Sequence, residues 1–408
     1  MIELSLAEVA QAVSGSLVKG DPNVLVTGTV ETDSRLVKAG SIFFARPGEV
    51  TDGHKFIGSA VELGAVAAVV DHEVDDAVAQ ILVPDVTAAL GKLAKYVLER
   101  IREKADIKVI GITGSNGKTT TKNMLRAILS QAGPTIAPIE SYNNEVGAPI
   151  SILKSDFETK YLVVELGAGG PGSIAYLADI AKPDLGVLLK VGLAHVGEFG
   201  GIETTAKIKG ELAAALNSDD LFIGNADDGY VRDMATDARQ VWFGTAPDAG
   251  YRATDLNLSI EGTNFEMRWP NGVSQRINLQ ILGEHHVMNA LAACAVADQL
   301  GLDHKQISAS LEALPLAERW RMQLMRREDG VYVINDAYNA SPDSMKAALQ
   351  TLAQLGRQGH RTIAVLGEMA ELGEFSANEH DAMGRIAVRL IIDQVLVVGK
   401  GAKLIHMG

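Results

Sequence analysis

The sequence predicts an α/β protein made of three successive domains. Its 408 residues, at about 150 residues per domain, favour two or three domains over one. Hydrophobic residues make up 47% of the chain and charged residues 22%, a globular composition that excludes general disorder. Strand-like apolar segments alternate with helical segments over most of the chain, which is the pattern of parallel sheets connected by crossover helices.

Residues 1–106 predict a small α/β domain. Short runs of β-branched and aromatic residues are bounded by turn signals such as Pro47-Gly48. The strands predicted from them are residues 42–45, 66–70 and 80–83. Residues 88–104 have apolar residues at helical spacing and end in a cluster of charges, which predicts a helix running into a linker. We therefore expect the second domain to begin at Ile107.

Residues 107–316 and 317–408 continue the alternation. The strands predicted in the second domain are residues 109–112, 161–165, 185–189 and 221–224. A polar alternating segment at residues 251–281 predicts antiparallel hairpins, and residues 286–300 predict a closing helix. The elements predicted in the third domain are strands at residues 331–335, 362–366 and 394–398 and helices that begin at Asp343 and at about Asn378.

Charge and cysteine content exclude several classes of protein. The chain has 51 acidic and 37 basic residues, a net charge of -14, and its basic residues are scattered, which disfavours nucleic-acid binding. Cys294, the single cysteine, lies in an apolar run and cannot form an internal disulfide, which fits a reducing compartment. The first residues carry acidic side chains and lack a basic leader, so we expect no secretory signal, and no apolar run reaches the roughly 20 residues that span a bilayer. We expect a cytoplasmic monomer without membrane insertion.

The most informative segment is Val109-Ile-Gly-Ile-Thr-Gly-Ser-Asn-Gly-Lys-Thr-Thr-Thr121, a buried strand and a glycine-containing loop that lead into a helical stretch. Glycines let a loop turn its amides toward phosphates, a helix N-terminus adds positive charge, a lysine meets the outer phosphates and a hydroxyl ligates magnesium. The spacing departs from the usual P-loop, because the first glycine would fall at Ile112, between Gly111 and Gly114. The strand, loop and helix together predict a nucleoside triphosphate site.

Three further residues follow predicted strands. Glu165 ends an apolar strand, where an acid near a phosphate loop is placed to hold magnesium; a merely solvated carboxylate is the alternative. His195 follows another strand, and Lys209 lies fourteen residues later on a helix predicted at residues 204–216. Spacing alone would not single them out, because a lone histidine is more often structural and Lys207 with Lys209 could form a solvated helix face.

These segments resemble the Mur ligases, the ATP-dependent amide-forming enzymes of peptidoglycan precursor synthesis. In the second domain the resemblance is carried by Thr113-Gly-Ser-Asn-Gly-Lys-Thr-Thr120, Glu165, His195 and Lys209. Six other segments extend it over nearly the whole chain: Thr32-Asp-Ser-Arg35, Gly40-Ser-Ile-Phe-Phe-Ala45, Thr51-Asp-Gly-His54, Asn143-Asn-Glu-Val-Gly-Ala-Pro149, Asn335-Asp-Ala-Tyr-Asn-Ala-Ser-Pro-Asp-Ser-Met345 and Val365-Leu-Gly-Glu-Met-Ala-Glu-Leu-Gly373.

The resemblance implies a first domain that binds the UDP-linked substrate, a central P-loop ATPase domain and a Rossmann-like third domain. It implies that ATP phosphorylates a carboxylate and that an amine attacks the acyl phosphate, while magnesium at two sites offsets the repulsion between anions. The implied substrates are UDP-N-acetylmuramoyl-tripeptide and D-alanyl-D-alanine, joined for cell wall biogenesis and hence for cell shape and division. Family third domains continue for several further elements, so we expect the third domain to be truncated.

The resemblance also implies roles for individual residues. Lys118, His195 and Lys209 would be catalytic, with Lys209 carbamylated, because an ammonium cannot ligate magnesium whereas a carbamate is an anionic oxygen donor. The metal ligands would be Thr119, Glu165, His195 and Lys209. The nucleotide contacts would be Ser115, Asn116, Gly117, Lys118, Thr119, Thr120, Asn289, Arg321, Asp336, Tyr338 and Asn339. The substrate contacts would be Ser34, Arg35, Asn143 and Asn144, although Ser34 and Arg35 fit a turn with a solvated arginine nearly as well.

Two positions depart from the family pattern, and two other functions stay open. His286 stands where some members have asparagine, and Trp320 stands where glycine often precedes the arginine. A related ligase that adds the third amino acid would be expected to carry an Asp-Asn-Pro-Arg segment, which these 408 residues lack. A nucleotide-gated binding protein would use the P-loop as a switch and would leave His195 and Lys209 as ordinary surface residues.

Overall fold

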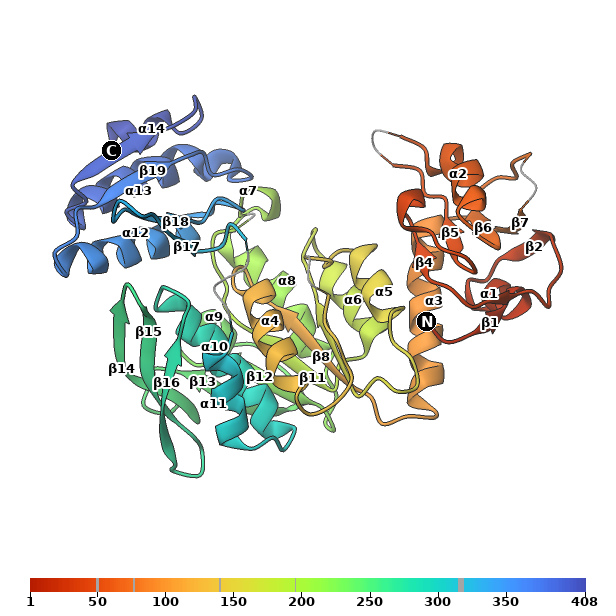
Figure 1. The fold of residues 1–408 in the computed structure, drawn as a ribbon, viewed down its shortest axis with the longest axis horizontal. Helices are drawn as coiled ribbons and strands as arrows, with labels where there is room; N and C mark the ends of the chain where they lie inside the picture. Colours follow the sequence, from red (N-terminus) through yellow and green to blue (C-terminus); the bar gives the residue numbers. More distant parts are fainter. Residues whose placement is uncertain (49–50, 76–77, 139–140, 195, 315–318) are drawn as a thin grey trace. The chain divides into compact units, whose positions relative to one another are not determined.

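The computed structural model describes residues 1–408 except 49–50, 76–77, 139–140, 195 and 315–318 (Figure 1). Its contacts divide the chain into two compact units whose segments interleave along the sequence. The first unit comprises Met1–Gly111, Gly133–Gly169 and Ala175–Pro183. The second unit comprises Ile112–Ala132, Gly170–Ile174 and Asp184–Gly408.

The N-terminal part of the first unit is built on a five-stranded sheet of order β2-β7-β6-β5-β4. Its strands are β2 (Ser16–Lys19), β4 (Val30–Glu31), β5 (Ile42–Phe44), β6 (Ala67–Val70) and β7 (Ala79–Leu82). Strands β4 to β7 run parallel and β2 pairs antiparallel at the edge. The three predicted strands are confirmed within one residue at each end. The smaller elements are β1 (Leu4–Ser5), α1 (Leu6–Ala12), β3 (Leu25–Val26), η1 (Ser34–Leu36), η2 (Gly53–Phe56) and α2 (Ile57–Glu62).

The long helix α3 (Val86–Arg102) begins two residues before the predicted start. The side chain of Asp85 accepts hydrogen bonds from the backbone amides of Thr87 and Ala88, so the helix is capped at Asp85. Its apolar face is buried, and it packs against α5 (Gly147–Ile152). The remaining elements near this unit are β9 (Thr135–Ile136), β10 (Tyr161–Glu165) and α6 (Ser173–Ala181).

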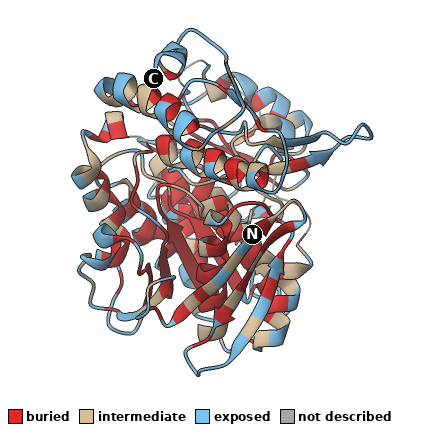
Figure 2. Ribbon diagram, turned by 90° about the vertical axis from the view of Figure 1, so that its left-hand side faces the viewer, coloured by how far each residue is buried: buried red, intermediate tan, exposed pale blue. Residues whose placement is uncertain are grey.

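The largest sheet has nine strands in the order β16-β15-β14-β13-β12-β11-β8-β10-β9. Its further strands are β8 (Lys108–Thr113), β11 (Leu185–Leu188), β12 (Leu221–Asn225), β13 (Arg239–Gly244), β14 (Tyr251–Ser259), β15 (Gly262–Arg268) and β16 (Ser274–Leu279). Strands β11 to β14 pair in parallel, and β14 to β16 form the expected antiparallel hairpins. Strand β13 was not predicted, because its first half is exposed and polar. Figure 2 shows buried residues gathered in this sheet.

The helices of the second unit include α4 (Lys118–Leu129) and α10 (His285–Gln299), which pack against each other (Figure 1). Cys294 is fully buried within α10, as its apolar surroundings predicted. The other described helices between residues 184 and 314 are α7 (Val196–Phe199), α8 (Ile202–Ala214), α9 (Gly229–Arg232) and α11 (His304–Glu312).

The last segment of the chain contains two short sheets. Strands β17 (Gln323–Arg326) and β18 (Tyr332–Asn335) pair antiparallel, whereas β19 (Ile363–Leu366) and β20 (Gln394–Val397) pair in parallel. The helical elements are α12 (Pro342–Arg357), η3 (Gly373–Phe375), α13 (Ser376–Arg389) and α14 (Lys403–Met407). Helix α12 starts one residue before the predicted position because Ser341 forms a capping box and Pro342 occupies the first turn.

Candidate nucleotide-binding site

The loop after β8 has the backbone geometry that phosphate binding needs. Gly114 and Gly117 adopt φ values of 149° and 88°, and Gly117 precedes the first residue of α4. A β-carbon at Gly117 would lie 2.3 Å from Oδ1 of Asn289, so both the conformation and the packing require glycine there. The loop therefore leads directly into a helix N-terminus, which carries free amides and partial positive charge.

Hydrogen bonds from β11 and the loop that follows it fix the first part of the phosphate loop. The amide of Ser115 donates to the carbonyl of Lys190 over 2.8 Å. The Ser115 hydroxyl accepts from the amide of Gly192 over 2.8 Å and donates to the carbonyl of the same residue over 3.2 Å. Ser115 is thus a structural member of the loop whose side chain is already engaged.

Lys118, Thr119 and Thr120 form the first turn of α4. The ammonium of Lys118 donates to the carbonyl of Gly114 over 2.7 Å and so folds back over the loop. Thr119 is 5% exposed, and its hydroxyl lies 3.5 Å from a guanidinium nitrogen of Arg321. Thr120 is half-buried. This turn therefore brings together a cation and a hydroxyl of the kinds that meet phosphate and magnesium.

Lys209 and Lys207 lie in very different surroundings on α8. Lys209 is 2% exposed, whereas Lys207 is exposed. Burial lowers the pKa of Lys209 well below its usual range, and the charge of nearby Lys118 lowers it further. His195, predicted to share a metal with Lys209, lies outside the described residues. The buried lysine is consequently an amine that loses its proton easily.

Glu165 is the last residue of β10 and is 2% exposed. The sequence placed it at a strand end, and the structure adds that the carboxylate is buried rather than solvated. Buried carboxylates are costly unless cations or hydrogen-bond donors accompany them. Its burial is at odds with the alternative of a solvated strand-end acid.

Asn289 and His286 project from the first turns of α10. Asn289 is 5% exposed and faces Gly117, as the Cβ distance above shows. Its amide nitrogen lies 3.3 Å from Nδ1 of His286. His286 is 4% exposed, its Nε2 has no hydrogen-bond partner among the described residues, and burial lowers its pKa well below the usual range. Burial therefore favours the neutral form of the His286 imidazole.

The residues expected from the third domain gather around Arg321. Its guanidinium lies 3.9 Å from the centre of the Tyr338 ring. Asp336 accepts a hydrogen bond from the amide of Met322 over 2.9 Å, and burial raises the pKa of its carboxyl to about 6 although Met322 and Arg321 act to lower it. Trp320 has a φ of 68°, the left-handed conformation that glycine adopts freely, so its backbone follows the glycine pattern despite the bulky side chain.

The side chains of Asn339 and Asn144 form local hydrogen bonds. Oδ1 of Asn339 accepts from the amide of Ala340 over 2.9 Å. Oδ1 of Asn144 accepts from the amide of Gly147 over 2.8 Å. The backbone carbonyl of Asn143 instead accepts from the amide of the distant residue Gly167 over 2.7 Å.

Asp343 is a residue of this region that the sequence analysis did not single out. Its carboxylate pairs with Lys190 over 2.8 Å and accepts from the amide of Leu193 over 2.8 Å. A β-carbon at Gly192, which also bonds Ser115, would lie 2.3 Å from the same carboxylate. Asp343 was predicted only as a helix start, and no local signal in the sequence reveals a partner 150 residues away.

Ser34 and Arg35 lie in η1 of the first unit. Asp33 accepts from the backbone amide of Arg35 over 3.0 Å and binds its guanidinium through both carboxylate oxygens. The Arg35 side chain is 86% exposed. The structure thus shows the turn with an exposed arginine that was one of the two interpretations, and it leaves the guanidinium accessible.

The donor set fits a nucleotide with magnesium. Nδ2 of Asn116 is buried without a hydrogen-bond partner among the described residues, and the Thr119 hydroxyl offers a hard oxygen atom. Nε2 of His286 is a second unsatisfied polar atom. Unsatisfied buried polar atoms near a helix N-terminus are what a bound phosphate or base would complete.

Comparison with family models places the chain in a known class of ligases. Residues 28–97 match the model "Mur ligase family, catalytic domain", residues 112–297 match "Mur ligase middle domain", and residues 320–406 match "Mur ligase, glutamate ligase domain". The chain belongs to the Mur ligase family. Within the residues that the structure describes, none of the helices has the length and apolar character needed to cross a membrane.

Individual relatives carry a more specific name. Proteins named UDP-N-acetylmuramoyl-tripeptide–D-alanyl-D-alanine ligase are 41% identical in Mycobacterium tuberculosis H37Rv, over 100% of this chain and 85% of the relative, and 34% identical in Escherichia coli K12, over 98% and 87%. A crystal structure of MurF from Acinetobacter baumannii has a TM-score of 0.91 at 34% identity and covers 100% of this chain and 88% of its own. The Thermotoga maritima MurF ligase in complex with ADP has a TM-score of 0.82 at 29% identity, covering 93% and 86%.

Proposed function

We propose that this chain joins D-alanyl-D-alanine to UDP-N-acetylmuramoyl-tripeptide at the expense of ATP. The terminal carboxylate of the tripeptide attacks the γ-phosphorus of ATP, which gives an acyl phosphate and ADP. The amine of D-alanyl-D-alanine then attacks the acyl carbon, loses a proton and expels phosphate, leaving an amide. The names of the high-coverage relatives support this pair of substrates over the addition of a third amino acid.

The observation that carries the proposal is the buried Lys209 beside Lys118. A charged ammonium in this position would be poorly solvated and repelled by Lys118, and both effects lower the pKa of Lys209. Its neutral amine can react with carbon dioxide to form a carbamate and release a proton. The product is an anion that attracts Lys118 and offers oxygen atoms to magnesium. A P-loop switch protein would leave Lys209 as an ordinary surface residue, and the burial of Lys209 argues against that alternative.

The remaining roles follow from the loop and its neighbours. Lys118 would contact the outer phosphates and the amides of the loop would cradle them, while Thr119 and Glu165 would hold one magnesium ion. Lys209 as a carbamate, with His195, would hold or orient a second. Magnesium supplies charge that offsets the repulsion between the triphosphate and the carboxylate. Asn289, Arg321 and Asp336 would position the nucleoside.

Each of the three predicted domains has its own role in the proposed reaction. Residues 1–106 would bind the UDP part of the substrate through Ser34 and Arg35, with Asn143 and Asn144 as further contacts. Residues 107–316 would bind ATP, and residues 317–408 would complete the nucleotide site. We propose a cytoplasmic location, because ATP, the UDP-linked tripeptide and D-alanyl-D-alanine are all soluble, and we propose that the enzyme acts as a monomer.

The test is phosphate release by the purified chain with ATP, magnesium and UDP-N-acetylmuramoyl-tripeptide. We expect phosphate to appear only when D-alanyl-D-alanine is added, with a product whose mass equals the two substrates minus water. UDP-N-acetylmuramoyl-dipeptide with a diamino acid serves as the matched control. Turnover of this control pair in place of the first would assign the enzyme to the other ligase group, and amine-independent ATP hydrolysis alone would refute ligation.

A further inference from the structure

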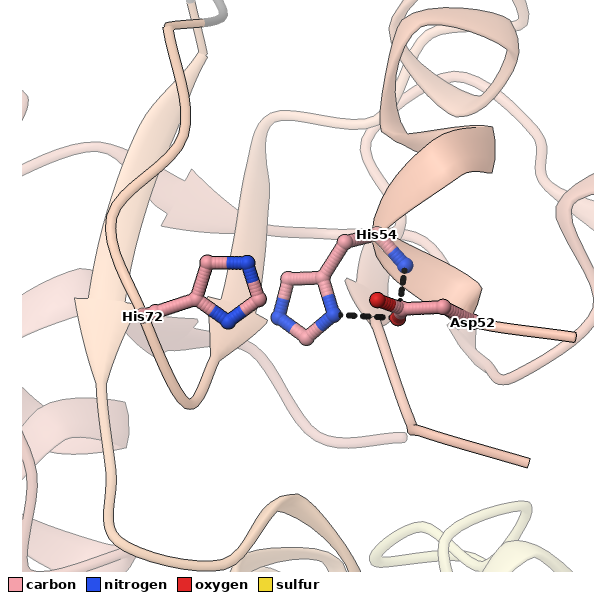
Figure 3. Close-up of side chains that lie close together, drawn as sticks. All are labelled: Asp52, His54 and His72. Atoms are coloured by element: carbon pink, nitrogen blue, oxygen red, sulfur yellow. Dashed lines mark hydrogen bonds and ion pairs between the residues drawn. The ribbon is translucent and has the colours of Figure 1, made fainter. Parts of the chain in front are cut away.

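A cluster of histidine and aspartate side chains lies in the N-terminal part of the chain, apart from the residues used in the proposed reaction. Asp52 and His54 stand at the start of η2, and Asp71 and His72 directly follow β6. Ligand atoms of Asp52, His54 and His72 all lie within 4.8 Å of one another (Figure 3). Two chain segments thus bring two imidazoles and two carboxylates to one place.

Asp52 holds the ring of His54 in a fixed orientation. One oxygen of Asp52 accepts from the backbone amide of His54 over 3.0 Å and lies 2.7 Å from Nδ1 of its ring (Figure 3). A carboxylate can only accept, so Nδ1 carries the proton and Nε2 keeps a lone pair. His54 is 7% exposed, which restricts the ring further. A carboxylate behind a histidine is the usual support of a metal-ligating imidazole.

Nε2 of His54 faces Asp71. It accepts a hydrogen bond from the Asp71 amide over 3.4 Å and lies 3.3 Å from Oδ1 of the same residue. Nδ1 of His72 lies 2.5 Å from the same Oδ1. The two rings stack with centroids 4.1 Å apart. In a tetrahedral zinc site with bonds of about 2.0 Å, neighbouring ligand atoms lie roughly 3.3 Å apart, which the His54–Asp71 pair already matches.

We propose that Nε2 of His54, Nδ1 of His72 and a carboxylate oxygen of Asp71 bind a zinc-like divalent transition-metal ion, with Asp52 orienting His54. Two imidazoles select against magnesium and calcium, which prefer oxygen ligands. The side chain of His72 is 58% exposed and can turn to widen its short contact with Asp71. Binding of the metal at Nδ1 of His72 would release the proton of that nitrogen to solvent, and the open side would leave room for water as the fourth ligand.

Cobalt(II) is a suitable probe, because tetrahedral cobalt absorbs visible light. The full chain, stripped with a chelator, would be titrated with cobalt(II) and then with zinc(II), without nucleotide so that the proposed magnesium sites are not formed. We expect a visible band that saturates at a single ion per chain and disappears when zinc is added. Absence of any such band in the wild-type chain would overturn the proposal.

Two variants distinguish the cluster from other histidines. Replacing the exposed His72 with alanine should not unfold the chain, and it should weaken cobalt binding by about 10- to 100-fold. His406→Ala removes another exposed histidine, on α14, and should bind cobalt as the wild type does. Equal affinity in the wild type and His72→Ala would contradict the proposal. Ligase activity is measured separately, so failure of this site leaves the proposed function untouched.

Discussion

The loop after β8 and the turn after β4 both present cations suited to phosphate, but they are built differently. In the loop, the ammonium of Lys118 donates a hydrogen bond to a backbone carbonyl of the same loop, and it lies near the buried Lys209. The surrounding backbone and the buried lysine therefore determine the position and the electrostatic environment of this cation. In the turn, the guanidinium of Arg35 is exposed and paired with Asp33, a neighbour two residues away.

The difference suggests that the two regions serve different purposes. A buried, preorganised group stabilises charge that develops during a reaction, because it needs no reorganisation when that charge appears. An exposed arginine can exchange a weak surface partner for a substrate phosphate, which contributes to binding more than to rate. Substitutions in the loop should therefore reduce kcat, and substitutions in the turn should raise KM.

The largest effect is expected for Lys118→Ala. Loss of one preorganised cation opposite developing phosphate charge should reduce kcat by about 100- to 1000-fold, while the affinity for the UDP-linked substrate changes little. Steady-state kinetics with each substrate varied would measure both quantities. A near-normal kcat in Lys118→Ala would show that this lysine does not contribute to catalysis.

Lys209→Ala should follow, with a loss on the order of 100-fold, because a metal-orienting anion is removed. Added acetate should restore part of the activity by supplying a carboxylate in the vacated space. Lys207→Ala is the matched control on the exposed side of the same helix and should stay close to wild type. If both variants lost activity to the same extent and acetate rescued neither, the buried lysine would have no special role in the reaction.

Arg35→Ala should raise KM for the UDP-linked substrate by about tenfold and leave kcat and Tm nearly unchanged. Arg327→Ala is a close control, because Arg327 forms the same kind of exposed, two-pronged pair with Asp329. It should change none of these values. A fall in kcat with constant KM in Arg35→Ala would show that the turn takes part in the chemical step.

The smallest effect concerns the pH dependence of ATP binding. The pKa of Asp336 is raised to about 6, so the carboxylate takes up a proton as the pH falls through that value. The neutral acid is a weaker acceptor for ribose hydroxyls, and KM for ATP should rise about 2- to 10-fold below pH 6. Asp336→Asn should show a raised KM that no longer varies over this range. An unchanged pH profile in that variant would exclude Asp336 as the titrating group.

Asp336 also affects stability in a defined direction. Its pKa in the folded chain lies above the usual value of 3.8, so between those two values the folded state holds a proton that the unfolded state lacks. The contribution of this group to stability therefore grows as the pH falls from about 6 to about 4. In Asp336→Asn the free energy of unfolding should no longer show this increase, and denaturant unfolding at about pH 6 and about pH 4 would measure the difference.

Local patterns were enough to predict the alternating elements and the phosphate loop. The glycines at positions 114 and 117 and the helix that follows are determined by nearby residues, so their geometry could be expected from the sequence. Helices α3 and α12 begin earlier than predicted, because Asp85 caps the first helix and Ser341 forms a capping box at the start of the second. Such caps depend on the hydrogen bonds of single side chains. Such shifts of one or two residues lie beyond what apolar spacing can define.

Long-range contacts could not be predicted. The burial that separates Lys209 from Lys207 depends on how α8 packs, and the pairing of Asp343 with Lys190 joins positions far apart in the chain. Family resemblance singled out Lys209 but not Asp343. Strand β13 was missed because its exposed first half lacks the apolar run used to recognise the other strands.

Carbamylation of Lys209 is central to the proposed reaction, and carbon-13 NMR of the protein in labelled bicarbonate would test it. The wild-type chain with magnesium and an ATP analogue should show a carbamate resonance. Lys207→Ala should keep this resonance, whereas Lys209→Ala should lose it, because Lys209 is the buried amine whose pKa is lowered. A carbamate signal that persists in Lys209→Ala, or its absence from an active wild-type enzyme, would contradict the central claim.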